Sequence, residues 1–392
     1  LYFQILDEKR KCKAIYQDDA LIDIFDPDKM THTWSYTPHL EGFNLQYADL
    51  WCSGASLDTV CPEDLKIQWK EVNQRAMAFL KSFNTAKIDL GDNCLFDLLP
   101  EGFLLEFYDL KNQITKSVFE NFEKPKNYDF MSDLACFIHR IKNRKLNLKF
   151  ENLNFSDDKV RNSFGKIKEV DPYVRYNPWA TATGRLATSP NSFPILNLNK
   201  ELRSAIVPTN NAFVELDYNA AELRVMLALL GQPQPKEDIH DWISKNIFDS
   251  KYDRDTTKKK VFAWLYNPKA KNKKLNEYLD RAKILEKFYK NNTVSTPYGR
   301  DIEVDEEKAV NYIIQSTTSD LFLTSAMKID KMLKDKKSKI AFCVHDSLVL
   351  DMCHKEKDLI SEIIEKFSGT KFADFKVNVS LGKNFGSMKK VR

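Results

Sequence analysis

The chain has 392 residues, 43% of them hydrophobic, so it is long enough for two or three domains with substantial cores. Sixty basic and 56 acidic side chains leave a net charge of only +4, which excludes a chain that binds nucleic acid through overall charge alone; any such binding has to come from local clusters. The longest apolar runs fall well short of the ~20 residues of a membrane span, and no signal peptide is visible, so we expect no membrane partner.

The cysteines are scattered and form neither a CxxC pair nor a zinc-like spacing with histidine. They are Cys12, Cys52, Cys61, Cys94, Cys136, Cys343 and Cys353. This distribution is typical of a reducing compartment. We therefore expect an intracellular protein, whether in cytoplasm or nucleoid, in a host cell if viral, or in an organelle.

The N-terminal part gives the weakest signals. Residues 1–4 (LYFQ) look like the remnant of a cleaved tag, so we leave them out of the predicted elements. No methionine starts the remaining chain, which suggests a piece of a longer protein. Residues 5–63 mix short apolar runs with turn residues and predict an irregular α/β segment of unknown role. Helical spacing with an acidic start predicts a helix over 64–83.

A second helix is predicted over 128–149, and its end is basic. The cations there are Arg140, Lys142, Arg144, Lys145 and Lys149. They favour either a solvated helix end that satisfies the helix dipole, or a helix lying along duplex phosphates. The sequence leaves both interpretations open.

From about residue 170 short strands alternate with helices. We predict strand 212–217, helix 219–230 closed by Gly231, helix 253–267 stopped by Pro268, helix 304–334, two strands over 340–352, helix 355–368 and strand 375–381. The fold class is therefore mixed α+β.

Two aspartates occupy exposed ends of these strands. Asp217 ends an apolar strand, and Asp346 lies at the tip of the 340–352 hairpin. Strand ends and tight turns present side chains to clefts, and two carboxylates from separate strands can hold a pair of Mg²⁺ ions. Aspartate is also common at turns, so this prediction depends on the other motifs.

Glu222 follows Asp217 by five positions. Asn219 and Glu222 have the spacing of a capping box, which by itself explains the glutamate. The functional alternative places Glu222 against the sugar of a bound nucleotide, where it blocks a 2′-hydroxyl. Both roles are compatible.

Four side chains recur at steps of four along helix 253–267: Arg254, Lys258, Phe262 and Tyr266. Such steps drift by only ~40° around a helix, so the four form one stripe about 18 Å long. Cations at the helix N-terminus suit a triphosphate, and the aromatics suit a sugar and base. The alternative is a solvated lysine face, with the aromatics in the core.

Taken together, these segments resemble family A DNA polymerases, the group of bacterial DNA polymerase I, over residues 170–392. The matching segments, in the family's order, are TGRL at 183–186, DYNAAELR at 217–224, the stripe, TPYGR at 296–300, NYIIQSTTSD at 311–320 and VHDS at 344–347. The resemblance implies a right-hand polymerase fold, with an antiparallel palm sheet, helical fingers and a helical thumb.

The same resemblance implies roles for particular residues. Asp217 and Asp346 are then the catalytic metal ligands, with the Tyr218 backbone carbonyl as a further ligand. Lys258 neutralises or protonates the leaving pyrophosphate. The expected nucleotide-binding residues are Arg254, Lys258, Phe262, Tyr266 and Glu222, and the expected primer-template contacts are Arg185, Gln315, His345, Asn311 and Arg224.

Three positions depart from the family pattern. Ser347 replaces the glutamate that follows the second catalytic aspartate, as in single-subunit RNA polymerases. Asn267 and Ser316 stand where the family has glycine. In the family, a glutamate at the position of Glu222 favours deoxy sugars, and a phenylalanine at that of Phe262 goes with rejecting nucleotides that lack a 3′-hydroxyl; the resemblance therefore implies a DNA polymerase.

The resemblance also implies domains, ligands and partners. We expect a tag remnant at 1–4, a lead-in at 5–63, a thumb-like region at 64–175, palm at 176–231 and 311–392, and fingers at 232–310 that close on the nucleotide. The expected cofactor is a pair of Mg²⁺ ions, with Mn²⁺ as a substitute, and the expected partners are primer-template DNA and deoxynucleoside triphosphates. An upstream domain, helicase or primase stays open. We find no convincing exonuclease motif and expect no proofreading.

Two rival functions remain. The first is a single-subunit-type RNA polymerase, which Ser347 favours. The second is a catalytically inactive DNA-binding module on a polymerase fold. Five residues argue against the second, because a decayed site has no reason to keep them all: Asp217, Asp346, Arg254, Lys258 and Tyr266.

Overall fold

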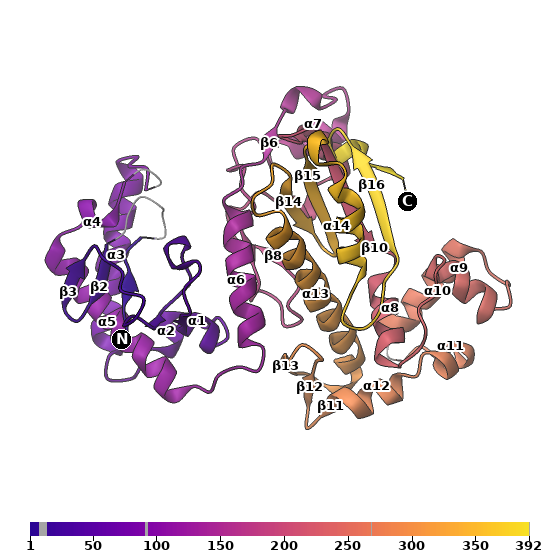
Figure 1. The fold of residues 1–392 in the computed structure, drawn as a ribbon, viewed down its shortest axis with the longest axis horizontal. Helices are drawn as coiled ribbons and strands as arrows, with labels where there is room; N and C mark the ends of the chain where they lie inside the picture. The colour runs from indigo at the N-terminus through magenta and orange to yellow at the C-terminus, as the bar shows by residue number, and fades with distance from the viewer. Residues whose placement is uncertain (8–13, 91–92, 268, 392) are drawn as a thin grey trace. The chain divides into compact units, whose positions relative to one another are not determined.

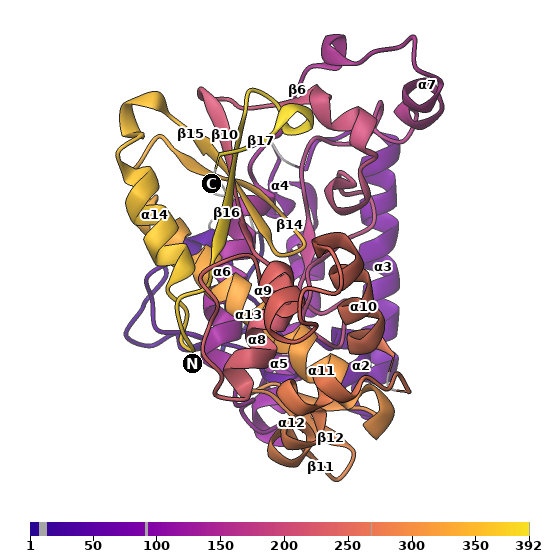
Figure 2. The same cartoon turned by 90° about the vertical axis from the view of Figure 1, so that its right-hand side faces the viewer.

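A computed structural model of the chain describes residues 1–7, 14–90, 93–267 and 269–391, which form two compact units, Leu1–His139 and Arg140–Arg392 (Figures 1 and 2). The predicted thumb region, 64–175, is divided between these units. The domain boundaries given above stay predictions. No helix among the described residues combines the length and apolar character needed to cross a bilayer.

The first unit combines small sheets with two long helices. Its strands are β1 (Gln4–Ile5), β2 (Ile15–Gln17), β3 (Ala20–Ile22), β4 (His32–Thr33) and β5 (Gln46–Tyr47). Its helices are α1 (Ala48–Trp51), α2 (Leu57–Val60), α3 (Lys66–Thr85), α4 (Leu95–Leu98), α5 (Glu101–Asn121) and most of α6 (Tyr128–Lys142). Trp69 and Val72 of α3 pack with Phe103, Leu110 and Ile114 of α5 in one core cluster.

Residues 1–4, which the sequence predicts to be a tag remnant, take part in the fold of the first unit. Gln4 opens β1, which pairs antiparallel with β2. Phe3 and Gln4 are fully buried, and the Gln4 amide donates hydrogen bonds to Asn112 and Thr115. The buried contacts of Phe3 and the hydrogen bonds of Gln4 hold this segment in the first unit.

Helix α6 ends earlier than predicted, at Lys142, and neither interpretation of its basic end holds for two of the arginines. Arg140 Nε lies 2.6 Å from one Asp330 carboxylate oxygen, and Arg144 Nη2 lies 3.1 Å from the other. Asp330 is only 4% exposed. Arg140 and Arg144 therefore neutralise a buried carboxylate within the second unit, rather than facing solvent or duplex phosphates.

The second unit is built on a five-stranded antiparallel sheet in the order β14-β15-β10-β16-β17 (Figure 1). These strands are β10 (Ala212–Tyr218), β14 (Lys339–Val344), β15 (Ser347–Met352), β16 (Val377–Gly382) and β17 (Lys389–Lys390). The strands predicted at 212–217, 340–352 and 375–381 are confirmed. Because β10 is central and pairs on both sides, whatever lies at its end is held rigidly.

Helices surround this sheet. They are α7 (Asp158–Phe164), α8 (Ala221–Leu229), α9 (Ile239–Asn246), α10 (Arg254–Tyr266), α11 (Lys273–Tyr278), α12 (Arg281–Phe288), α13 (Glu306–Met332) and α14 (Leu359–Ser368). Helix α14 packs on β10 and β16, and α13 packs on α14 and α8. The predicted helices over 219–230, 253–267, 304–334 and 355–368 are confirmed within a few residues. Pro268, the expected helix stop, lies outside the described residues.

Short strands complete the second unit. They are β6 (Asn147–Leu148), β7 (Tyr176–Asn177), β8 (Ala187–Thr188), β9 (Ile206–Val207), β11 (Tyr289–Lys290), β12 (Thr293–Ser295) and β13 (Asp301–Glu303). Five cysteines of the described part of the chain are free thiols: Cys52, Cys61, Cys136, Cys343 and Cys353. Cys94 is disulfide-bonded, which the scattered pattern did not predict, and Cys12 lies outside the described residues.

Candidate active site

The sheet brings the two predicted aspartates together. Asp217, near the end of β10, pairs with Ser347 of β15 on one side and Asn378 of β16 on the other. Asp346 directly precedes Ser347 in the turn of the β14–β15 hairpin, where His345 has a left-handed backbone with φ 54°. Two carboxyl groups that are 129 positions apart in the chain therefore lie at the same end of adjacent strands.

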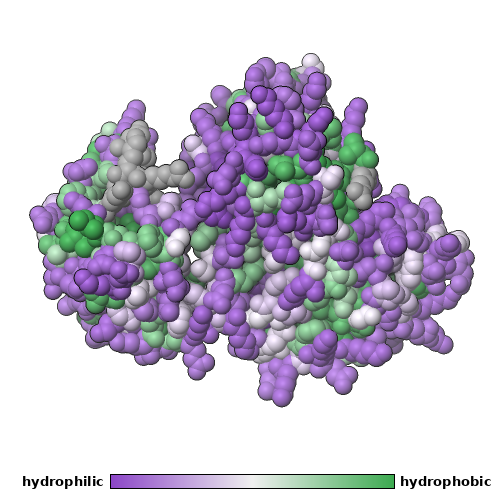
Figure 3. All heavy atoms as spheres, viewed as in Figure 1, coloured by the Kyte–Doolittle hydropathy of each residue, from purple (hydrophilic) through white to green (hydrophobic). Residues whose placement is uncertain are grey.

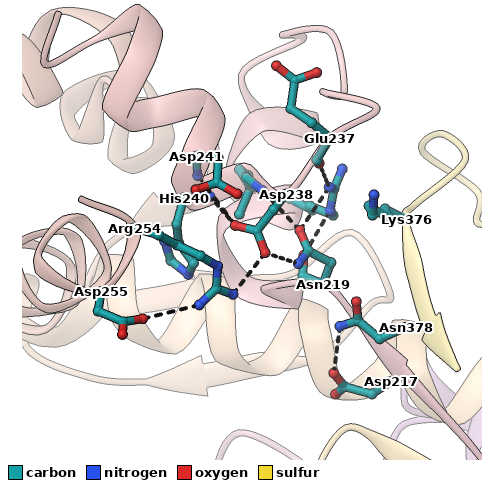
Figure 4. Close-up of polar contacts among 12 residues, drawn as sticks. Asp217, Asn219, Glu237, Asp238, His240, Asp241, Arg254, Asp255, Lys376 and Asn378 are labelled. Atoms are coloured by element: carbon teal, nitrogen blue, oxygen red, sulfur yellow. Dashed lines mark hydrogen bonds and ion pairs between the residues drawn. The ribbon is translucent and has the colours of Figure 1, made fainter. Parts of the chain in front are cut away.

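The two carboxylates repel each other. Burial, and then the charge of Asp346, raises the pKa of Asp217 to about 7, although the Asn378 amide donates a 3.1 Å hydrogen bond to it (Figure 4). The charge of Lys390 offsets this only in part, and a pair of carboxylates with incomplete compensation is the environment that a divalent ion stabilises. Among the described residues no group of three or more acidic, histidine or cysteine side chains suits a metal. Two carboxylates fit Mg²⁺, which takes few protein ligands and shares its other positions with phosphate and water.

Three more predicted residues form a cluster beside this pair. Glu222, in the first turn of α8, accepts hydrogen bonds from the Tyr266 hydroxyl and from Arg185. Burial raises the pKa of Glu222, and these two partners oppose the shift. Glu222 therefore links the sheet end to helix α10.

The capping box predicted for Asn219 and Glu222 is wrong. The residue that caps α8 is Ala220, with a left-handed φ of 52° and no side-chain cap. The Asn219 side chain points elsewhere: its oxygen accepts from Ile239 N–H at 3.0 Å, and its amide donates to Asp238 at 2.8 Å. Glu222 is thus freed from the helix end for its contacts with Tyr266 and Arg185.

Helix α10 presents the stripe on one face. The rings of Phe262 and Tyr266 stack with centroids 5.7 Å apart, and Lys258 Nζ lies 5.8 Å from the Phe262 ring. Val261, Trp264 and Leu265 form the buried face instead. Tyr266 is 42% exposed, so the alternative in which the stripe aromatics belong to the core does not hold for it.

A cavity of about 410 Å³ joins the two halves of the site. Its walls include Arg185, Glu222, Phe262, Tyr266, His345 and Asp346. Arg185 comes from the loop before β8 and Glu222 from α8. The two aromatic residues come from α10, and His345 and Asp346 come from the hairpin turn. Side chains from four separate parts of the sequence therefore converge on one enclosed space.

The loop that carries Arg185 is anchored beneath the cavity. Ser319 of α13 donates a 2.8 Å hydrogen bond to the Gly184 carbonyl. A Cβ on Gly184, whose φ is +72°, would lie 2.5 Å from the Arg300 guanidinium, so only glycine fits there. Arg300 is itself held by Asp320 at 2.8 Å in a buried ion pair. The TPYGR and NYIIQSTTSD segments thus support the TGRL segment structurally.

One predicted primer-template contact is contradicted. Arg224 is fully buried, and its guanidinium donates to the carbonyl oxygens of Asn219, Pro235 and Glu237 at 2.8, 2.9 and 3.1 Å. It cannot reach a nucleic acid without leaving these partners. Arg224 is therefore a structural clamp on the segment that enters α9.

Of the remaining predicted contacts, only His345 lines the cavity. His345 is exposed at the hairpin tip, and Gln315 is half-buried on α13. Asn311, one helical turn before Gln315, donates to the Tyr266 carbonyl at 3.4 Å. The Tyr218 ring is buried and stacks on Phe367, and the proposed role of the Tyr218 carbonyl stays a prediction.

The structure adds two residues that the sequence reasoning missed, Asp238 and His240 (Figure 4). Asp238 caps α9. Its carboxylate accepts a hydrogen bond from the Asn219 amide and another, 2.8 Å long, from Arg254 Nη2. Burial raises the pKa of Asp238, but the hydrogen bonds from Arg254 and Asn219 outweigh it and hold that pKa well below its usual range. The sequence signal was a helix-starting aspartate before an apolar run.

His240 lies in the first turn of α9, and its ring faces the stripe. Its ring centroid is 5.8 Å from that of Phe262, and its buried Nδ1 has no hydrogen-bond partner among the described residues. Burial lowers the pKa of His240 to about 4; the charges of Arg254 and Lys258 lower it further and Asp238 opposes. A neutral imidazole with an unused nitrogen therefore faces the middle of the stripe.

Comparisons with known proteins find similarity to DNA polymerases. The model of DNA polymerase family A matches residues 270–387, which include α13 and the whole β14–β15 hairpin. DNA polymerase I of Aquifex aeolicus is 26% identical over 271 residues, 57% of this chain and 46% of the relative. Residues 270–387 therefore match DNA polymerase family A, and the chain is similar to DNA polymerase I.

Two further matches agree with this similarity. The DNA polymerase of Bacillus phage SP01 is 27% identical over 269 residues, which are 50% of this chain and 29% of the relative. The chain spans less than half the length of both relatives. The POL domain of Pol1 from M. smegmatis, solved in complex with DNA primer-template and dNTP, aligns with a TM-score of 0.67 at 13% identity over 98% of this chain and 95% of that one. The chain therefore has the right-hand polymerase fold.

Proposed function

We propose that this chain is a template-directed DNA polymerase of family A that adds deoxynucleotides to a primer 3′ end. The observation that carries the proposal is the convergence of Asp217 and Asp346 at one end of adjacent strands, with Asp346 lining a cavity whose other walls hold Glu222, Phe262 and Tyr266. Metal-binding carboxylates, a sugar-side glutamate and stacked aromatics are then within one enclosed site. Primer-template DNA and deoxynucleoside triphosphates are the substrates.

Asp217 and Asp346 would hold two Mg²⁺ ions, or Mn²⁺ in their place. When bound, such ions supply charge stabilisation and a more acidic primer hydroxyl. The raised pKa of Asp217 supports the assignment, because a cation would replace the proton that burial and Asp346 otherwise favour.

The protein side chains position the nucleotide. Arg254 and Lys258, in the first half of α10, bind the triphosphate where free amides and the helix dipole add positive potential. Phe262 and Tyr266 carry the sugar and base. Lys258 also neutralises or protonates the leaving pyrophosphate, a contribution typical of general acids.

Selection of the sugar falls to Glu222. Its carboxylate is held by Tyr266 and Arg185 on the wall of the cavity, so a 2′-hydroxyl meets a group that is fixed rather than free to turn away. Ser347 does not oppose this assignment, because its hydroxyl is used in a 2.7 Å hydrogen bond to Glu215. We therefore favour deoxynucleotides over ribonucleotides.

Primer extension on a defined template tests the proposal. With Mg²⁺ and deoxynucleotides the protein should extend the primer to the template end, and with ribonucleotides it should stall. Preferential use of ribonucleotides would indicate an RNA polymerase. Salt-sensitive binding of the duplex without extension of either kind would indicate a DNA-binding module.

A further inference from the structure

Helix α10 has a second basic face, turned away from the stripe. Lys260 follows Lys258 by two positions, which is about 200° around a helix. It borders a separate cavity of about 540 Å³ whose lining also includes Lys251, Lys271 and Trp264. None of the residues that line this cavity also lines the active-site cavity.

Positive charge concentrates around this outer cavity. Residues 245–274 contain ten basic and three acidic side chains, although the whole chain carries a net charge of only +4. Hydrophilic residues cover the region of α9 to α11 (Figure 3). Within the described part of the chain no ion pair involves Lys251, Lys260 or Lys271, whereas Lys274 is paired with Asp249. Three exposed ammonium groups at one cavity favour a polyanion.

An aromatic ring lies among these cations. Lys260 Nζ is 4.5 Å and Lys251 Nζ 5.6 Å from the centroid of Tyr252. Phe248 packs edge-on against the same ring at 5.3 Å, and the Tyr252 carbonyl accepts from Ser244, so the ring is held in place. Lysines around a fixed aromatic face combine the two features that bind single-stranded nucleic acid: phosphate contacts and base stacking.

We propose that this outer cavity, defined by Lys251, Tyr252, Lys260 and Lys271, binds the unpaired part of the template strand. The inference rests on the proposed polymerase function, which supplies such a strand next to α10. The phosphates contact the three lysines, and one base stacks on Tyr252. An acidic protein segment satisfies the lysines but supplies no base to stack on the Tyr252 ring, so the single strand is favoured.

Overhang length provides the test. A helix with its side chains is about 10–12 Å across, so two nucleotides at roughly 3.4 Å each cannot pass from one face of α10 to the other, while twelve can. Fluorescence anisotropy then compares one primer-template duplex with a two-nucleotide or a twelve-nucleotide 5′ template overhang. Wild-type protein should bind the longer overhang about tenfold more tightly, a factor within the range of one stacked base.

The decisive variant is Lys251→Glu/Lys260→Glu/Lys271→Glu. It should lose the overhang-dependent gain while it keeps wild-type affinity and extension rate on the two-nucleotide overhang. The salt dependence of the long-overhang complex should fall by about two in logarithmic slope, since each single-strand phosphate contact contributes roughly 0.7.

A control with the same change in charge is Lys355→Glu/Lys357→Glu/Lys383→Glu. These exposed lysines follow β15 and β16 at the end of the sheet where Met352 pairs with Ala212 and Gly382 with Phe213, opposite the Asp217 end. The control should keep the overhang-dependent gain. Tyr252→Ala, which leaves every charge in place, should reduce that gain and guards against a triple variant that unfolds.

Several results would overturn the inference. One is equal affinity of wild-type protein for the two overhangs, and another is an unchanged gain in the triple-glutamate variant. Polyglutamate can be added as a competitor. If it abolishes the tighter binding of the long overhang equally in wild type and in Tyr252→Ala, the cavity binds an acidic protein segment instead. Absence of extension on the two-nucleotide overhang would instead overturn the proposed function, a separate readout.

Discussion

Two aspartates in the second unit have pKa values shifted in opposite directions, although each lies just before a helix, Asp217 before α8 and Asp238 before α9. Asp217 faces Asp346, and its pKa is raised to about 7 by burial and by that charge. Asp238 accepts from Arg254 and Asn219 and caps α9, and its pKa is lowered despite burial. Figure 4 shows the two residues on either side of Asn219. The first carboxylate is left for a cation from outside, and the second already has its cation.

The comparison therefore separates activity from stability. The Asp217–Asp346 pair, whose negative charges repel each other, should be needed for catalysis but should not stabilise the folded protein. Asp238, whose charge is balanced by Arg254 and which caps α9, should stabilise the folded protein. The predictions below run from the largest expected effect to the smallest.

Asp217→Asn and Asp346→Asn should each lower the rate of primer extension by at least about a thousandfold, since metal-assisted charge stabilisation is worth several kcal/mol. Binding of the duplex, measured by fluorescence anisotropy, should persist. Asp358→Asn, which changes an exposed acid before α14, serves as the control and should extend normally. A rate within tenfold of wild type for either site variant would contradict the metal assignment.

Lys258→Ala should lower the single-turnover rate about a hundredfold to a thousandfold, within the range of general acid catalysis. Lys259→Ala is the matched control, because the neighbouring lysine lies about 100° further round the same helix. Rapid-quench measurement of the first nucleotide addition separates chemistry from product release. Near-normal chemistry in Lys258→Ala would show that the stripe does not act on the triphosphate.

His240 should make the protein sensitive to acid. Its pKa is lowered to about 4, so from pH ~6.5 downward the unfolded state binds a proton that the folded state refuses. Wild-type protein should therefore lose on the order of 2–3 kcal/mol between pH ~6.5 and ~4, and His240→Gln should not lose it. Urea unfolding at several pH values measures this difference. His345→Gln, at the exposed hairpin tip, should follow wild type.

Asp238→Ala should lower the free energy of unfolding by about 1–2 kcal/mol, the usual cost of a lost helix N-cap. Asp217→Asn should not destabilise the protein when a chelator removes divalent ions, because it removes one of two repelling charges. Thermal unfolding of both variants under the same conditions measures the contrast. Equal destabilisation by the two substitutions would remove the distinction between the two aspartates.

The parts of the site that the sequence predicted share one property: their role follows from local pattern. Backbone geometry places one carboxylate at the end of an apolar strand and another in a hairpin turn, whereas the expectation that Asp217 and Asp346 act together came from the set of motifs that resembles family A polymerases. The stripe follows from the period of the helix alone. The sequence pattern could not show that polar side chains of α6 and α8 are buried.

The wrong predictions involve residues whose partners are distant in the chain or whose helix has no exposed face. Every residue of α8 except Ala228 is buried, so no periodic pattern could show that Arg224 faces inward. Arg140 and Arg144 meet Asp330, which is 190 and 186 positions away. Asn219 has the spacing of a capping residue but is drawn to Asp238 and Ile239 instead. Tertiary partners outweighed local preference at each position.

The clamp formed by Arg224 limits where movement can start. Its guanidinium holds the carbonyl oxygens of Pro235 and Glu237 from within the helix that follows Asp217. If α9 and α10 swing as a lever when substrate arrives, the segment up to Glu237 has to stay with the sheet, and the pivot falls at Asp238 or beyond. The first bond that such a swing would strain is then the one between Asn219 and Asp238.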